Sequence, residues 1–291
     1  MSKHIVECSN AEAQNLNTGA KEQCLEGVTI RHALATDEQE FASAESAKTL
    51  ADWKTARDSK NIIPLYEIEE LNVADTEDTF FAGREKNYKT ANGKKIRKFN
   101  CFLGVCSHRA LKSYNGKKMR VYEFTDQQEI LGTTPDGVKV KGQLVTIEVG
   151  KRVSAMPDKP AYTPVTLTYA DYNEFEDAPV VLKPSWSQIE LNGIMDVDLE
   201  LVSASATSIK FKADAGCAGD VVTSLVTANV LLLNADGTPK THSFVAPDAN
   251  GVYELTGTGF ANGMTINLNG VVAKTEDSYE STGALTIAGI S

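Results

Sequence analysis

The amino-acid sequence predicts a mainly β protein, and three observations lead to this prediction. Two turn signals, Asn115-Gly116 and Pro135-Asp136-Gly137, lie between apolar or alternating segments in residues 94–153. Such turns are typical of antiparallel strands joined by hairpins. About seven short apolar runs follow one another in residues 197–291. The clearest helical pattern occupies only residues 36–60, so strands are expected to dominate the chain.

Composition divides the chain into two parts. At 291 residues the chain is long enough for two domains. Pro179, Pro184 and the residues up to Gly193 are typical of a connector, and the sequence beyond it is rich in Ala, Thr, Ser and Gly. We therefore predict a first domain over residues 1–195 and a second over residues 196–291.

The first domain is expected to begin with a mostly irregular arm, residues 1–35, that contains one short strand. The next segment, residues 36–60, has capping-box spacing at Thr36 and Gln39 and an apolar stripe that includes Trp53. These features predict one flanking helix that packs on the sheet and ends near the end of this segment.

An antiparallel sheet is predicted for the centre of the first domain. Residues 118–124 alternate, which places Tyr122 on one face and Val121 and Glu123 on the other. Residues 144–149 alternate in the same way and present an apolar face. Upstream, residues 65–73 alternate as a single strand with one acidic face.

Residues 75–92 are polar and are expected to form a long loop or a protruding hairpin. A segment of this length inside a compact domain usually has a function or is mobile.

The second domain is predicted to be an immunoglobulin-like β-sandwich. About seven short strands in such a length fit this fold, although the Cys and Trp pattern of antibody domains is missing. Asp236-Gly237 and Asn250-Gly251 are hairpin-type turns. The expected strands are 199–203, 208–213, 228–233, 242–245, 252–256, 264–268 and 284–290.

Charge is unevenly distributed along the chain. The formal net charge is -10; residues 196–291 hold four basic and eleven acidic side chains, and residues 1–195 hold 25 basic and 28 acidic ones. Acidic side chains cluster in residues 67–78, whereas residues 84–120 carry twelve basic side chains and a single acidic one. Oppositely charged segments of one chain can meet between copies, in a head-to-tail contact that builds rings or filaments.

These two charged segments supply the candidate subunit-interface residues. The candidates are Glu67, Glu69, Glu70, Asp75, Glu77, Asp78, Arg84, Lys86, Lys89, Lys94, Lys95, Arg97 and Lys98. A basic stretch with interleaved aromatic residues is also typical of a nucleic-acid groove, which is the alternative interpretation. The near-neutral balance of residues 1–195 argues against that alternative, because a dedicated nucleic-acid binder is usually basic overall.

No motif in the sequence indicates an enzyme, and we predict no catalytic residue, no cofactor and no metal. Cys101, Cys106 and His108 form the one thiol and imidazole cluster, but an extended strand would turn the two thiols to opposite sides. The carboxylates around Glu174 and those around Asp198 would allow a hydrolase, because glycoside cleavage needs two carboxyl groups. The second group alternates along a predicted strand and is more simply its solvated face.

The order of these features resembles the tail tube proteins of tailed bacteriophages. The resemblance rests on the irregular arm, the β domain with one flanking helix, the long polar loop, the Asn-Gly turn and the segment DGVKVKG before a long apolar strand. The second domain is similar to the immunoglobulin-like domain that some of these proteins carry.

This resemblance implies a tail-tube-like β-barrel or sandwich that self-assembles into stacked, hexameric rings. It implies contacts with other tail proteins and a lumen through which DNA passes without specific binding. The lumen of this family is typically acidic, and Glu67 and Glu69 are candidates to face it.

The resemblance places the protein in the virion tail after synthesis in the host cytoplasm. The first residues lack the apolar core of a signal peptide, and no window approaches the ~18 apolar residues of a membrane span, so no membrane partner is expected. The alternative function is a binding module, either a nucleic-acid binder through the basic stretch or a carbohydrate-binding adhesin through the sandwich.

Overall fold

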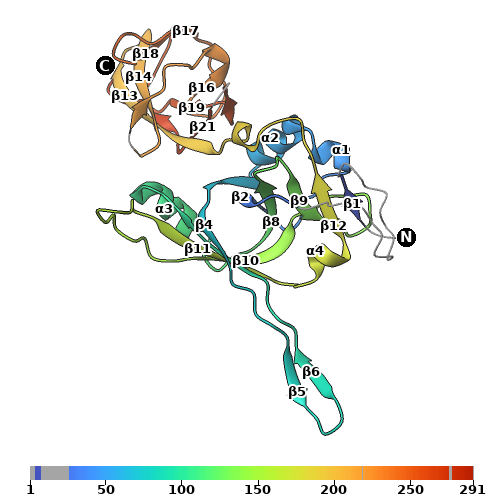
Figure 1. The fold of residues 1–291 in the computed structure, drawn as a ribbon. Coiled ribbons are helices and arrows are strands. Elements are labelled where there is room, and N and C mark those ends of the chain that lie inside the picture. The colour runs from blue at the N-terminus through green and yellow to red at the C-terminus, as the bar shows by residue number, and fades with distance from the viewer. Residues whose placement is uncertain (1–3, 8–25, 218, 275–276, 291) are drawn as a thin grey trace. The chain divides into compact units, whose positions relative to one another are not determined.

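The chain folds as two units that both consist mainly of strands (Figure 1), so the predicted mainly β fold is confirmed. The units are residues 1–191 and 192–291. The boundary precedes the predicted one because strand β13 (Ile194–Ala204) belongs to the second unit. This computed structural model describes residues 4–7, 26–217, 219–274 and 277–290.

A ten-stranded sheet forms the framework of the first unit. Its strands are β1 (Ile5–Val6), β2 (Thr29–Ala35), β3 (Ile62–Glu67), β4 (Glu69–Val73), β7 (Ile96–Cys101), β8 (Lys118–Thr125), β9 (Ile130–Thr133), β10 (Gln143–Val149), β11 (Thr163–Tyr169) and β12 (Pro179–Leu182). The pairings run from β4 through β7, β11, β10 and β8 to β2 and β3. Strand β3 leads directly into β4 but does not pair with it, so these strands form a circuit that the sheet closes only in part, a half-barrel.

Strand β8 separates two apolar cores. Met119 and Val121 belong to a core inside the circuit, together with Ile147 of β10. Tyr122 and Phe124 belong to a second core on the opposite face of β8. The alternation predicted for residues 118–124 is therefore confirmed, and both of its faces are buried.

Two short helices, α1 (Ala44–Ala47) and α2 (Leu50–Asp58), cover the second core in place of the single predicted helix. The prediction that helix formation begins at Thr36 is wrong. Phe41 instead forms a β-bridge with Val140, and Ser43 is the N-cap, its side chain accepting a hydrogen bond from the backbone N–H of Ser46 at 3.2 Å.

Two further helices are present, α3 (Val105–Lys112) and α4 (Glu174–Asp177). Helix α3 was not predicted. The hairpin expected at Asn115-Gly116 is wrong, because this turn joins a helix to a strand and not two strands. Arg109 and Lys112 lie in the last turn of α3, where basic side chains interact favourably with the helix dipole. Among the described residues, none of the helices has the length and apolarity that a membrane crossing requires.

The strand predicted for residues 65–73 is interrupted. Leu65 and Ile68 are both buried in the core inside the circuit, although their spacing of three would place them on opposite faces of a regular strand. Ile68 lies between β3 and β4 and belongs to neither strand, and Glu70 in β4 adopts a positive φ of 53° where the register with β7 shifts. On the two sides of this interruption, β3 pairs with β2 and β4 pairs with β7.

The second unit is a two-sheet sandwich around one core, as predicted. Its larger sheet contains β13, β14 (Ser208–Ala215), β15 (Asp220–Val221), β17 (Ser243–Val245), β18 (Tyr253–Thr256), β20 (Val272–Ala273) and β21 (Ser278–Ser281). Its smaller sheet contains β16 (Val230–Leu233), β19 (Thr265–Leu268) and β22 (Leu285–Thr286). All seven predicted strands have counterparts, although only Leu285–Thr286 of the strand predicted for residues 284–290 is found, and β15, β20 and β21 are additional. Phe211 and Tyr253, stacked at 5.4 Å, pack with Ile266 of the smaller sheet.

Two 3-10 helices complete the elements: η1 (Gln188–Glu190) in the first unit and η2 (Thr227–Asn229) in the second.

Candidate functional site

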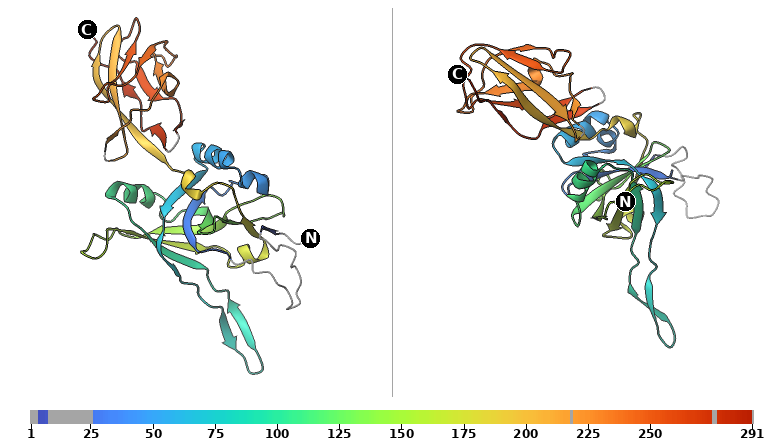
Figure 2. Two further views of the ribbon diagram at one scale, coloured as in Figure 1. Left: turned by 45° about the horizontal axis from the view of Figure 1, so that its top comes forward. Right: turned by 90° about the vertical axis from the view of Figure 1, so that its left-hand side faces the viewer.

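A hairpin of strands β5 (Thr79–Ala82) and β6 (Asn87–Ala91) projects from the body of the first unit (Figures 1 and 2). It confirms the protruding hairpin that was one of the two structures expected for residues 75–92. The two strands form a sheet of their own, and every residue in them is exposed. No core of the first unit includes them.

The hairpin carries three exposed aromatic side chains. Phe80, Phe81 and Tyr88 are 56%, 64% and 52% exposed. Phe81 pairs directly with Tyr88, and Phe80 pairs with Lys89. Because successive side chains of a strand point to opposite faces, Phe81 and Tyr88 lie on one face and Phe80 on the other. Both faces of the hairpin are therefore partly apolar.

Polar contacts fix the base of the hairpin. The Asp78 carboxylate accepts a hydrogen bond from the Gly93 N–H at 2.7 Å and forms an ion pair with Lys89 at 2.5 Å. The Thr76 hydroxyl accepts a hydrogen bond from the Lys94 N–H at 2.8 Å. These contacts hold the segments before β5 and after β6 together at the base of the hairpin.

Several predicted interface residues pair within the chain. Arg97 forms an ion pair with Asp75 at 2.6 Å, in addition to the pair between Lys89 and Asp78. Glu70 pairs with Lys159 at 2.6 Å. Some of the ion pairs between the acidic and basic segments therefore form within one chain. The prediction had placed these contacts between copies.

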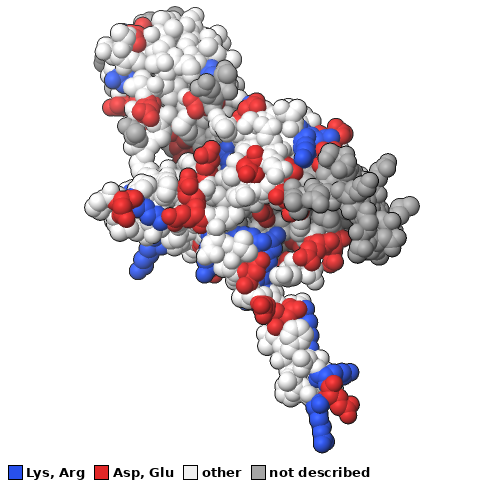
Figure 3. Space-filling model, in the orientation of Figure 1, with Lys and Arg blue, Asp and Glu red and all other residues white. Residues whose placement is uncertain are grey.

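The other candidates divide by exposure. Lys95 lies in a polar pocket described below, with a side chain only 14% exposed. The remaining side chains are exposed and form no ion pair among the described residues: Glu67, Glu69, Glu77, Arg84, Lys86, Lys94 and Lys98. Figure 3 shows basic and acidic side chains together at the tip of the hairpin, with uncharged surface along it.

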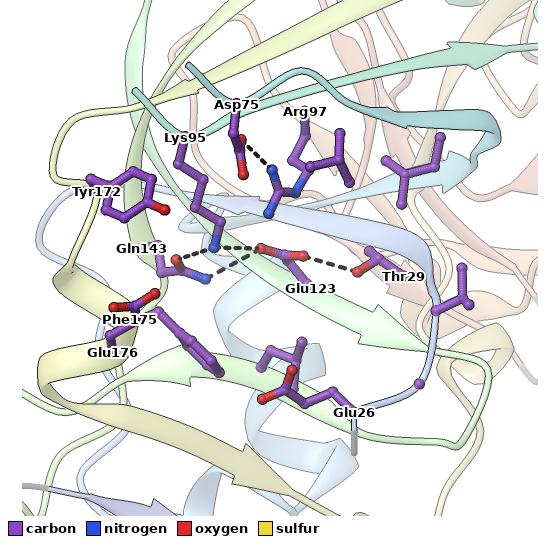
Figure 4. A pocket seen from close by; sticks show the side chains of 15 residues that line it. Glu26, Thr29, Asp75, Lys95, Arg97, Glu123, Gln143, Tyr172, Phe175 and Glu176 are labelled. Carbon is purple, nitrogen blue, oxygen red and sulfur yellow. Dashed lines mark hydrogen bonds and ion pairs between the residues drawn. The ribbon is translucent and has the colours of Figure 1, made fainter. Parts of the chain in front are cut away.

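A polar pocket opens beside the barrel strands of the first unit (Figure 4). Its volume is about 590 Å³, and its lining includes Lys95, Glu123 and Gln143 together with the aromatic Tyr172 and Phe175. The side chains come from β8, from the start of β10, and from the segments before β7 and around α4.

Glu123 is the centre of a hydrogen-bonded cluster in this pocket. It is buried, and it accepts hydrogen bonds from the hydroxyls of Tyr169 at 2.6 Å and Thr29 at 2.9 Å and from the Gln143 amide at 3.2 Å. Lys95 donates a hydrogen bond to the Gln143 amide oxygen at 2.9 Å, and its Nζ lies 3.8 Å from the Glu123 carboxylate and 4.3 Å from the centre of the Tyr169 ring.

Close packing of the backbone brings these groups together. A Cβ at Gly142 would lie 2.8 Å from the backbone of Val121, so glycine allows the start of β10 to approach β8. Gln143, the next residue, then reaches Glu123. The Tyr169 N–H donates to the Lys95 carbonyl at 3.0 Å, which fixes Lys95 at the end of β11.

Burial shifts the protonation equilibria of the cluster. It lowers the pKa of Lys95, against the opposing effect of Glu123. Burial would raise the pKa of Glu123, but Lys95, His32 and the hydrogen bonds from Tyr169 and Thr29 together hold this pKa below its ordinary value. Burial and Glu123 raise the pKa of Tyr169 well above its ordinary value, so its hydroxyl keeps its proton.

Sequence reasoning missed the cluster except for Lys95, which was taken for a surface residue. One signal was present: Glu123 is a charged residue at an inward position of an alternating strand, between Val121 and Thr125. A carboxylate at such a position must find partners, because an unpaired buried charge is costly.

His32 lies next to the cluster, and its burial has a measurable consequence. Its ring is fully buried and stacks on Phe99 at 4.8 Å, with no hydrogen-bond partner for either ring nitrogen among the described residues. Burial lowers the pKa of His32 to about 4; Glu123 opposes this decrease, and Arg97 and Lys95 add to it.

We expect His32 to make the first unit less stable in mild acid. An unfolded histidine has a pKa of about 6.5, so between pH 6.5 and 4 the unfolded chain binds a proton that the folded chain excludes. This group should remove about 2 kcal/mol of stability between about pH 7 and pH 5. The variant His32→Phe keeps a ring against Phe99, and urea titrations at the two pH values should show a smaller loss for it. An equal loss in both proteins would contradict this role of His32.

Two of the carboxylates considered for catalysis have simple structural roles: Glu174 accepts hydrogen bonds within the fold, and Asp198 lies on a solvent-exposed strand face. Glu174 accepts hydrogen bonds from Arg120 at 2.9 Å and from the Leu144 N–H at 2.8 Å. Asp198 lies on the exposed face of β13, as predicted. The described residues contain no group of three side chains that could hold a metal ion.

The comparisons with known proteins give no family for this chain. No protein-family model matches it, and no curated protein matches it significantly. The hairpin, the exposed charges and the polar pocket are the features of the first unit that bear on function.

Proposed function

We propose that this chain is a structural virion protein, the subunit of a bacteriophage tail tube that self-assembles into stacked hexameric rings around a DNA-conducting lumen. The projecting hairpin is the observation that supports this proposal most. An isolated two-stranded hairpin is at best marginally stable in water, and exposed aromatic side chains are typical of interface cores. Because Phe80 and Phe81 lie on opposite faces, contact with neighbouring subunits on both sides of the hairpin would bury both.

Charge supports a second copy of the chain as the partner. The tip of the hairpin carries exposed Arg84 and Lys86 on either side of Glu85, while Glu67 at the end of β3 and Glu69 at the start of β4 are exposed on the body of the unit. One chain thus offers both signs of charge on separate exposed segments, which allows complementary contacts between identical subunits.

Passage of DNA without specific binding is part of the proposal. Lys89 and Arg97, which would belong to a nucleic-acid groove, are paired with Asp78 and Asp75. The competing acidic groups reduce the attraction for phosphates, on which nonspecific nucleic-acid affinity depends. This pairing favours the tube subunit over the nucleic-acid binder.

The second unit fits the role of an appended domain. It folds around its own apolar core, with Phe211 and Tyr253 at the centre, and its two sheets are complete without strands of the first unit. Such a domain can be carried by an assembled subunit without taking part in the tube wall.

Electron microscopy of the purified chain tests the proposal directly. At low ionic strength and high protein concentration we expect rings or stacked tubes. Raising the salt to about 1 M should weaken them, because the screening length of exposed charges falls to about 3 Å. Residues 1–193 alone should form thinner tubes. A strictly monomeric protein in sedimentation at low salt would contradict the proposal.

A further inference from the structure

Three reactive groups meet at the floor of the polar pocket (Figure 4). Lys95, just before β7, supplies an amine; Gln143, at the start of β10, supplies a carboxamide; Glu123, in β8, supplies a carboxylate. The amine donates to the carboxamide oxygen at 2.9 Å, the carboxamide N–H donates to the carboxylate at 3.2 Å, and the amine lies 3.8 Å from the same carboxylate oxygen. Each group therefore lies next to the other two.

We propose that Lys95 and Gln143 join in an intramolecular isopeptide bond, with Glu123 as the catalytic residue that transfers the proton. This inference does not depend on the proposed tail tube function. A neutral lysine amine is a nucleophile, and the carbon of a carboxamide is an electrophile. Fixing the two in contact replaces a slow bimolecular reaction with an intramolecular one.

The reaction balances without any further reagent. Glu123 takes a proton from the Lys95 ammonium, and the freed amine attacks Cδ of Gln143 to form the new C–N bond. The protonated Glu123 then gives its proton to the Gln143 amide nitrogen, to which it is already hydrogen-bonded. The bond from Cδ to this nitrogen breaks, and the nitrogen, which also takes up the second proton of the attacking amine, leaves as ammonium. Glu123 ends as the carboxylate with which it began.

The surroundings favour this chemistry in two ways. Lys95 lies over the rings of Tyr169 at 4.3 Å and Phe175 at 5.4 Å, and burial lowers its pKa, which makes the neutral amine easier to form. Glu123 and Gln143 are almost completely buried, so water competes little for the acyl carbon. The adjoining cavity gives ammonia a route away from the site.

Tyr169 is a positioning residue in this arrangement. Its hydroxyl donates to Glu123 at 2.6 Å, and its backbone N–H holds Lys95 at 3.0 Å. Strand β11 lies between β10 and β7 in the sheet, so the new bond would span it and tie its two neighbours together. The cross-link would prevent these strands of the barrel from separating.

Mass spectrometry of the folded full-length chain tests the proposal. The intact mass should be lower than the calculated mass by one ammonia, and a tryptic digest should contain a branched peptide that joins Lys95 to Gln143, with no cleavage after Lys95. Chain recovered from insoluble inclusion bodies directly into guanidinium, which has not yet folded, should keep the full mass and lose ammonia after refolding. This difference would show that the fold produces the bond.

Matched variants assign the roles. Lys95→Arg keeps the positive charge beside Glu123 but removes the amine, and Glu123→Gln removes the proton carrier; each should retain the full calculated mass, with the fold checked by circular dichroism. Lys94→Arg changes the exposed neighbour and should still lose ammonia. Tyr169→Phe should slow the loss after refolding at least about tenfold, because Glu123 loses its shortest hydrogen bond. Folded wild-type chain that keeps its full mass on long incubation at neutral and alkaline pH would overturn the proposal, as would an ammonia loss that maps to other residues.

Discussion

Replacing Trp53 by alanine is expected to lower the free energy of unfolding of the first unit by about 3 to 5 kcal/mol. Trp53 is fully buried at the centre of an aromatic cluster, with its ring 4.6 Å from Phe41, 5.0 Å from Tyr122 and 6.0 Å from Trp186. Its indole N–H donates to the Ala47 carbonyl at 2.7 Å. The alanine variant would leave a large cavity under α2 and an unpaired carbonyl at the end of α1.

Fluorescence can follow this change in the first unit alone. The chain has two tryptophans, Trp53 and Trp186, and both lie in the first unit. Urea titration of Trp53→Ala, observed through Trp186, should show the lower midpoint, while Trp53→Phe should lose much less because a ring remains. Val105→Ala, at an exposed position of α3, should change stability by less than about 0.5 kcal/mol. A Trp53→Ala loss of that small size would contradict the central role of the aromatic cluster.

The fold was predictable where side-chain periodicity and local turns determine it. Residues 118–124 alternate in the sequence and in β8, because both faces of the strand meet apolar cores. Periodicity failed where tertiary contacts bend or interrupt the backbone. The interruption at Ile68 breaks the alternation of β3 and β4, and the bridge from Phe41 to Val140 delays the start of the helix to Ser43.

The candidate site was predictable only where the polarity of a local segment determines its structure. The polarity of residues 75–92 indicated a segment that leaves the core, and the hairpin is that segment. The polar pocket was not predicted, because Lys95, Glu123 and Gln143 are far apart in the sequence and meet only through the pairing of β7, β8, β10 and β11. The spacing of residues along the sequence does not indicate contacts of this kind.

Removing the aromatic side chains of the hairpin is expected to abolish self-assembly. The variant carries Phe80→Thr, Phe81→Thr and Tyr88→Thr, because threonine keeps a high strand propensity while it removes the ring. Burial of an aromatic side chain contributes about 1.5 to 3 kcal/mol, so three of them at each contact should raise the concentration needed for assembly at least about 100-fold. Sedimentation velocity over a range of protein concentrations measures this threshold, and micrographs should show no rings.

A control must separate loss of an interface from a general loss of surface apolarity. Tyr66 and Phe102 are exposed aromatic residues outside the hairpin, 51% and 43% exposed. The double variant Tyr66→Thr and Phe102→Thr should therefore assemble like the wild type. The folding of the hairpin variant should be unchanged in circular dichroism, because none of its three rings belongs to a core of the first unit. If the hairpin variant assembled as readily as the wild type, the exposed charges and not the aromatic faces would have to hold the subunits together.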